Sequence, residues 1–204
     1  KIMRKILLLL FLLASFPMWA QVIKNSGIII NAGKEKISSN LPYSIEGVAT
    51  PVDMDNSYLK GKFSMELGYR FRLQPKQSRF FYDIDLLGGY TKSEYAVNFK
   101  SFGNTQYGER SGTNDLLSFS LAGSVNFNIF RGLNVGLGVQ PTAYIWDTRF
   151  FDIPVFAKVS YDLKYVELAF SYKCGLSKEY KISPFKSSRL SQWQFSVYVP
   201  LWKR

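Results

Sequence analysis

Two aspartates, Asp83 and Asp85, lie two positions apart, and a close pair of carboxylates is what glycoside hydrolases use for acid–base chemistry. The same residues also allow a structural interpretation. If residues 74–79 close a β-hairpin, the register places Arg70 opposite Asp83. Because buried charges must be paired, we favour charge pairing over catalysis for both aspartates.

Further charged residues lie in segments where every second side chain is otherwise small and polar. These residues, which we expect to join Arg70, Asp83 and Asp85 in one interior charge network, are Glu66, Arg72, Lys158, Glu167 and Lys173. Such a network stabilises a structure only when each charge finds a partner. The set is therefore predicted to be structural.

The chain contains no histidine. This excludes Ser–His and Cys–His nucleophile pairs, histidine metal sites and histidine general bases within the chain. Cys174 is the only cysteine, so no intrachain disulfide is possible. It continues an apolar parity, and apolar surroundings disfavour the reactive thiolate. We therefore expect no catalytic residue, no cofactor and no metal site.

The first twenty residues resemble a secretory signal peptide, with a basic start, an apolar run over residues 6–14 and a cleavage point at Ala20-Gln21. We expect residues 1–20 to be this signal helix and residues 21–204 to form one domain. The net charge is +11, but lysine and arginine are scattered along the chain. Nucleic-acid binding would need them clustered on one element, so we expect no nucleic-acid partner.

Two-residue alternation of apolar and polar side chains dominates the rest of the chain. In residues 62–73, Phe63, Met65 and Leu67 alternate with Lys62, Ser64 and Glu66. Similar alternation recurs over residues 80–90, 117–129, 133–140, 153–163, 166–173 and 192–201, which gives seven strands. No later segment is long enough to be a membrane-spanning helix. A membrane protein of this kind must therefore be a closed barrel.

The connections between these strands alternate in length. Residues 74–79, 130–132 and 164–165 are short, whereas residues 91–114, 142–152 and 175–189 are long. Short turns belong on the periplasmic side and long loops outside. A periplasmic N-terminus then requires an eighth strand upstream of Lys60. We assign it to residues 22–32, with residues 42–48 as the alternative.

Which parity faces outward follows from the size of the side chains. The interior of an eight-stranded barrel only just accommodates its side chains, and the apolar parity is crowded with Phe, Tyr and Trp. The polar parity is rich in Ser, Gly, Asn and Ala. The sequence therefore predicts an all-β fold, a closed antiparallel up-and-down transmembrane β-barrel of about eight strands with its apolar residues facing lipid.

The mature chain, residues 21–204, resembles the small outer-membrane barrels of the OmpA/OmpX type and the porin-like barrel proteins of Bacteroidetes. The resemblance rests on Ala20-Gln21, on the strand pattern and on Ile153-Pro154-Val155-Phe156. It implies the outer membrane of a Gram-negative bacterium, with both termini periplasmic. The chain departs from the pattern at its end, because Trp202 precedes Lys203-Arg204 where such barrels often end on an aromatic residue.

The long loops interleave aromatic and basic residues. A binding surface for glycans, lipopolysaccharide or a protein ligand is one interpretation, with Tyr95, Tyr107, Arg110, Trp146, Arg149 and Tyr180 as its candidate residues. An interfacial aromatic girdle, with cations meeting lipid phosphates, is the other interpretation and the one we favour.

The sequence thus predicts a non-enzymatic barrel that acts through membrane integration and loop contacts. Outer-membrane lipid and lipopolysaccharide are the expected partners. The alternatives are a narrow pore for small solutes and a lipid-modifying enzyme that uses carboxylates alone.

Overall fold

The structure, a computed structural model, describes residues 21–40, 52–99, 110–182 and 185–203. All regular elements in these ranges are strands. They are β1 (Gln21–Asn40), β2 (Val52–Pro75), β3 (Phe80–Phe99), β4 (Arg110–Phe130), β5 (Leu133–Val139), β6 (Thr142–Trp146), β7 (Phe150–Asp152), β8 (Val155–Asp162), β9 (Glu167–Cys174), β10 (Tyr180–Ile182) and β11 (Phe185–Lys203). The predicted signal segment, residues 1–20, lies outside the described residues.

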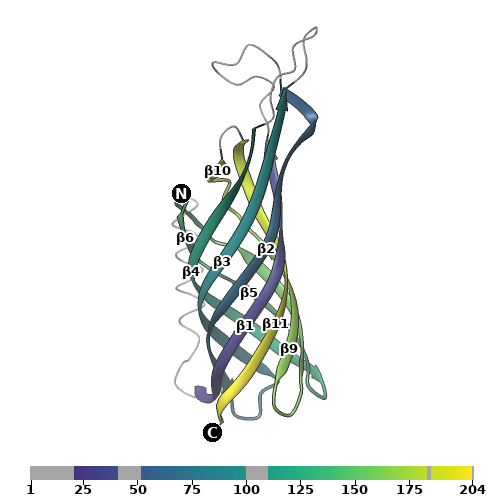
Figure 1. Ribbon diagram of the computed structural model, residues 1–204. Coiled ribbons are helices and arrows are strands. Elements are labelled where there is room, and N and C mark those ends of the chain that lie inside the picture. The colour runs from purple at the N-terminus through teal and green to yellow at the C-terminus, as the bar shows by residue number, and fades with distance from the viewer. Residues whose placement is uncertain (1–20, 41–51, 100–109, 183–184, 204) are drawn as a thin grey trace, which may run out of the picture.

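The strands form a closed antiparallel barrel (Figure 1). Eight of them follow one another around the ring in the order β3, β2, β1, β11, β9, β8, β5 and β4, and the pairing of β3 with β4 closes it. The predicted fold class is confirmed. The eighth strand is β1, which includes the predicted residues 22–32, while the alternative, residues 42–48, lies outside the described residues.

Prolines interrupt two positions of the ring. β4 pairs first with β5 and then with β6, and the break between these two falls at Pro141. Pro154 likewise separates β7 from β8. Because proline has no N–H to donate to a strand ladder, each break divides one long strand in two. The predicted strand over residues 153–163 therefore begins later, at Val155.

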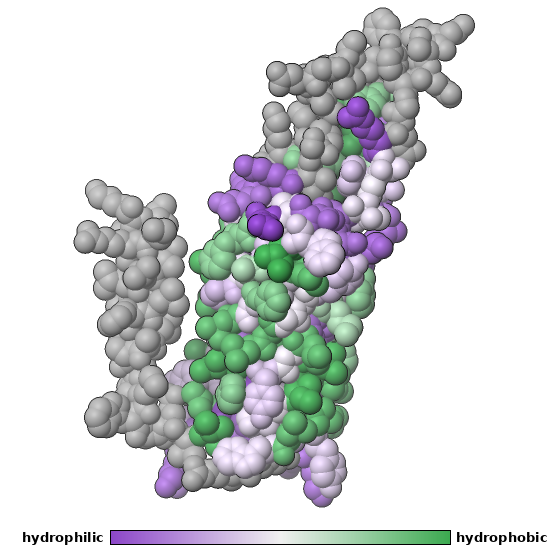
Figure 2. Space-filling view, turned by 60° about the vertical axis from the view of Figure 1, so that its left-hand side comes forward, coloured by the Kyte–Doolittle hydropathy of each residue, from purple (hydrophilic) through white to green (hydrophobic). Residues whose placement is uncertain are grey.

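An apolar belt surrounds the barrel. Side chains along each ring strand alternate between exposed apolar and buried polar, as in β3, where Ile84 and Leu86 are exposed and Asp83 and Asp85 are buried. Figure 2 shows the belt in green on one face, with hydrophilic residues in purple above it. The predicted outward direction of the apolar parity is confirmed, and the fold is that of a transmembrane β-barrel.

No helix in the described part of the chain is long and apolar enough to cross a membrane.

One end of the barrel, here called the turn end, carries the short connections. β2 and β3 are joined through residues 76–79, and β4 and β5 through Arg131 and Gly132 alone. Both of these residues have positive φ, 37° and 91°. That pair of angles is the signature of a two-residue turn whose twist matches the twist of the strands it joins.

At the opposite end the strands continue past the belt, and this part is called the extension. Residues 91–114 and 175–189 were expected to be loops, but β3 runs to Phe99, β4 begins at Arg110, and β10 pairs with β11. β2 also begins at Val52, eight residues before the expected start at Lys60. The loop prediction was wrong because these outer strand segments enclose an apolar core of their own. The buried members of this core are Val52, Leu59, Val97, Leu116, Tyr180, Phe185 and Leu190.

Candidate functional site

The interior near the turn end contains a cluster of three cations and three carboxylates, here called the inner ion cluster. Its members come from four strands: Arg70, Arg72, Asp83, Asp85, Lys158 and Glu167. Each is less than a tenth exposed. The cluster contains as many positive as negative side chains, which is the condition for keeping so many charges away from water.

Asp83 and Asp85 each accept two bonds from an arginine. Arg72 Nε and Nη2 donate to the Asp83 carboxylate at 2.7 and 3.0 Å, and Arg70 Nε and Nη2 donate to Asp85 at 2.7 and 2.8 Å. Such paired contacts are the strongest geometry for an arginine and a carboxylate. Lys158 Nζ adds a bond of 2.7 Å to Asp83.

Glu167 joins the two arginines from the other side of the interior. Arg70 Nη1 lies 3.1 Å from Glu167 Oε1, and Arg72 Nη1 lies 2.6 Å from Glu167 Oε2. Residues more than ninety positions apart in sequence therefore meet at one place. The cluster ties β2, β3, β8 and β9 together across the barrel.

The register of the β2–β3 hairpin differs from the expected one. Arg70 is paired with Asp85 and Arg72 with Asp83, instead of Arg70 with Asp83. Arg70 still approaches Asp83, but only to 3.6 Å. The expected register was wrong by two residues because Leu73 pairs with Tyr82, not Phe80, which lengthens the loop between the strands.

A second charged pair lies closer to the extension. Lys173 Nζ contacts Glu66 Oε1 and Oε2 at 3.0 and 2.8 Å, and Asn31 and Gln140 also donate to this carboxylate. The eight charged residues of the predicted network therefore lie in two groups instead of one. Every one of them has an oppositely charged partner.

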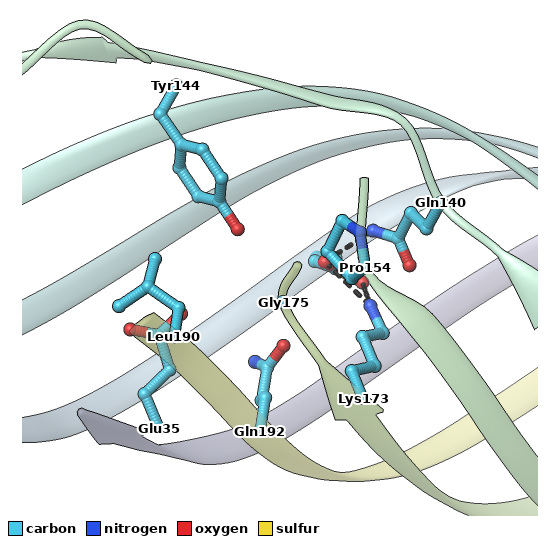
Figure 3. Close-up of a pocket in the computed structure, with 9 residues that line it drawn as sticks. Glu35, Gln140, Tyr144, Pro154, Lys173, Gly175, Leu190 and Gln192 are labelled. Carbon is cyan, nitrogen blue, oxygen red and sulfur yellow. Dashed lines mark hydrogen bonds and ion pairs between the residues drawn. The ribbon is translucent and has the colours of Figure 1, made fainter. Parts of the chain in front are cut away.

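Beside this pair lies a space of about 10 Å³ lined in part by Glu35, Tyr144 and Gln192. Figure 3 shows these three side chains facing the same space. Glu35 is 5% exposed, and its Oε1 accepts a bond of 3.3 Å from Thr91. Sequence reasoning missed Glu35, although it follows the same alternation as Asn31 and Gly33.

These contacts define what the interior can do chemically. A general acid or base needs access to the proton it transfers, whereas Asp83, Asp85 and Glu167 are buried and bonded to cations. Among the described residues, no group of three or more His, Cys, Asp or Glu side chains has the arrangement of a metal site. The arrangement favours charge pairing for the aspartates.

Apolar residues fill the interior between and above the ion pairs. Ile29, Leu87, Ala122 and Tyr198 form one buried group, against which Phe156 packs. Beyond the Glu66–Lys173 pair, the core of the extension forms another. The interior is thus occupied in successive layers of charged and apolar side chains.

The candidate loop surface divides into buried and exposed residues. Tyr180 is 1% exposed, and Tyr95 packs against the same apolar core. Their assignment to an exposed loop was wrong because Tyr95 lies on β3, which continues into the extension, and Tyr180 lies on β10, which pairs with β11. Arg110, Trp146 and Arg149 are exposed as expected, and Tyr107 lies outside the described residues.

Tyr180 shows why the core of the extension accepts a phenol. Its hydroxyl lies 2.8 Å from Ser93 Oγ and accepts a bond of 3.1 Å from Asn114 Nδ2. Burial raises the pKa of Tyr180 to about 12. The neutral phenol is therefore the form that the folded extension holds.

Exposed lysines gather on the outer face directly above the apolar belt, and this group is called the lysine face. Its members, from β1, β2 and β3, are Lys34, Lys36, Lys60, Lys62 and Lys92. In the register, Lys92 pairs with Phe63 of the belt and Lys34 with the exposed Trp193. Two acidic residues adjoin the group: Glu94, at 2.8 Å from Lys62 Nζ, and Asp115, which is paired with Lys92 in the register. The lysine face can be recognised in the sequence, because lysines occupy every second position where the alternating apolar residues end.

Belt, closed ring and filled interior together define a small transmembrane β-barrel. The chain matches no protein-family profile. No curated protein matches it in sequence.

Solved structures that are similar to the chain include the following two. Neisserial surface protein A is 15% identical, with a TM-score of 0.41, over 85% of this chain and 96% of that chain. Ail, the attachment invasion locus protein of Yersinia pestis, was solved in complex with the heparin analogue sucrose octasulfate. It is 10% identical, with a TM-score of 0.40, over 87% of this chain and 98% of that chain.

Proposed function

We propose that this protein is a non-enzymatic barrel of the outer membrane of a Gram-negative bacterium, exported by a signal peptide over residues 1–20. The turn end and both ends of the mature chain face the periplasm, and the extension faces outward. The apolar belt supports the membrane location. Short turns at one end and long extended hairpins at the other support the orientation.

The lysine face binds the phosphate groups of lipopolysaccharide. The observation that carries this proposal is the position of five exposed lysines directly above the belt, where lipid headgroups lie. Trp193 beside Lys34 is 49% exposed, as expected for an aromatic residue at the membrane surface. On this proposal the barrel organises the anionic lipids around one of its sides.

Lipid that co-purifies with the protein tests this assignment. The protein is extracted from outer membranes in a mild detergent, and the lipid A that remains bound is quantified by mass spectrometry. We expect several-fold less bound lipid A for a variant with Lys34→Gln, Lys36→Gln and Lys92→Gln. A matched control removes the same charge elsewhere on the barrel, through Arg131→Gln, Lys178→Gln and Lys181→Gln, all at exposed positions. Equal retention in the two variants would contradict the proposal.

A second contact surface is supported by the exposed loop residues. Trp146 is 66% exposed, with a φ of 98° that places its backbone in a region rare for side chains other than glycine. Asp147 Oδ2 accepts a bond of 2.9 Å from the Asp115 N–H and fixes this hairpin to β4. With Arg110 and Arg149, Trp146 forms a surface for an extracellular glycan or protein ligand.

The filled interior favours these surface roles over a pore for small solutes. The paired state of Asp83 and Asp85 likewise favours a non-enzymatic protein over an enzyme that modifies lipid with carboxylates. Membership of the porin-like barrels of Bacteroidetes remains a proposal that rests on the residues Ile153-Pro154-Val155-Phe156.

A further inference from the structure

A cavity of about 260 Å³ opens at the turn end of the barrel, and it is called the turn-end cavity. Its inner wall includes Arg72 and Phe81, which are 3% and 4% exposed. Lys24 and Arg79, which are exposed, line it nearer the solvent. The cavity therefore continues from the barrel mouth to the edge of the inner ion cluster.

The charges that line the cavity are unequal. Three are positive, from Lys24, Arg72 and Arg79, and one is negative, from Asp162. Arg72 is already balanced within the inner ion cluster, where it pairs with Asp83 and Glu167. The net excess in the cavity is therefore one positive charge, from Lys24 and Arg79 against Asp162. An anionic group entering the cavity meets a positive environment partly shielded from water, where charge-assisted hydrogen bonds are strong.

Hydrogen bonds hold the polar lining in place. Lys24 Nζ donates to Gln74 Oε1 at 2.6 Å, and Gln74 Nε2 donates to the Ser78 carbonyl at 2.6 Å. On the opposite wall, Asn128 Nδ2 donates to Asn134 Oδ1 at 2.7 Å. Lys24 has three donors, so the ammonium keeps capacity for a ligand while its position is fixed. A pre-positioned site binds with a smaller loss of entropy.

We propose that the turn-end cavity binds the C-terminal carboxylate of a short peptide. A single negative charge suits the lining better than a dianionic phosphate, because it matches the net excess of one positive charge in the cavity. The side-chain amides of Gln74 and Asn128 match the donors and acceptors of peptide bonds, and the Phe81 ring offers an apolar contact. That the peptide comes from the periplasm rests on the proposed orientation, whereas the binding itself does not.

Titration of two matched probes tests the proposal. The protein is purified from membranes in a zwitterionic detergent and titrated with N-acetyl-Ala-Ala as the free acid and as its C-terminal amide, by isothermal calorimetry. We expect saturable binding of the acid and at least tenfold weaker binding of the amide. Arg79→Gln should weaken the binding of the acid by about tenfold, which is the effect of losing one charge-assisted hydrogen bond.

Arg131→Gln is the matched control, because Arg131 lies at the same end but does not line the cavity. Its variant should bind the acid as the unmodified protein does. Equal binding of acid and amide would overturn the proposal, as would equal weakening by Arg79→Gln and Arg131→Gln. Inorganic phosphate that binds as tightly as the acid would show a general anion site and overturn the carboxylate assignment. Each outcome is obtained in detergent and is independent of the orientation in cells.

Discussion

Asp83 is the acceptor on which the inner ion cluster depends. It receives bonds from Arg72, Lys158 and Asn126, and Arg70 Nη1 lies 3.6 Å away. Removing one partner from a buried pair leaves the other charge without compensation, which costs far more than the pair contributes. The cluster therefore responds to single substitutions more strongly than to exchange of both partners.

Asp83→Asn should lower the free energy of unfolding by about 3 kcal/mol or more, because Lys158 loses the carboxylate it contacts and Arg72 loses one of its two carboxylate partners. Urea unfolding in lipid vesicles measures this. A double-mutant cycle should give a larger coupling for Arg72 with Asp83 than for Arg70 with Asp83, given the distances of 2.7 and 3.6 Å. Lys62→Gln, at an exposed pair, serves as the control and should change little. A larger coupling for Arg70 with Asp83 would contradict this pairing and would support the register expected from sequence.

Tyr180 makes the stability of the extension depend on alkaline pH. Its pKa rises from 10.0 to about 12 because burial disfavours the phenolate. A raised folded-state pKa means that its contribution is fully present below pH 10 and is lost as the pH rises through about 12. Proteolysis of the extension should therefore accelerate over this window. Tyr180→Phe should remove the pH step attributable to this group, and a step that persists in the variant would contradict the assignment.

At the scale of elements, the tight turn between β4 and β5 depends on Gly132. Its φ is 91°, and an added Cβ would lie 2.8 Å from the Asp162 carbonyl oxygen. Gly132→Ala should thus destabilise the barrel by about 1–3 kcal/mol. Arg131→Asn should be neutral or stabilising, because asparagine tolerates positive φ better than arginine. Unfolding of the two variants in the same vesicles tests the pair, and equal effects would contradict this account of the turn.

The length of the strands was harder to predict than their existence. Alternation at Phe63, Met65 and Leu67 reveals the lipid-facing belt because lipid selects apolar side chains at every second position. Above the belt one side meets water and the other an apolar core, so Val97 and Leu116 lie inward and the parity of the pattern reverses. A strand whose apolar side chains change from the outer to the inner side shows no continuous alternation, so its sequence resembles that of an irregular loop. The paired register of Arg70 likewise depends on turn geometry that sequence does not specify.

At the scale of the whole molecule, the interior is filled from the inner ion cluster to the core of the extension. A permeating ion would have to displace paired charges and packed apolar side chains. The protein in planar bilayers should therefore show no steady single-channel openings. The double variant Asp83→Leu with Arg72→Leu, which removes one positive and one negative charge together, should likewise show no steady openings. Regular openings of the unmodified protein would favour the pore.

In the proposed topology, the barrel spans the outer membrane with its extension outside and its turns in the periplasm. Because Cys174 is the only cysteine, a Cys174→Ser background allows single cysteines to be placed at Thr113, in the extension, or at Lys76, in the β2–β3 turn. Intact Gram-negative cells are treated with a membrane-impermeant maleimide. We expect labelling of Thr113→Cys in intact cells and of Lys76→Cys only after lysis. Labelling of Lys76→Cys but not Thr113→Cys in intact cells would contradict the orientation, and labelling of neither before lysis would contradict surface exposure.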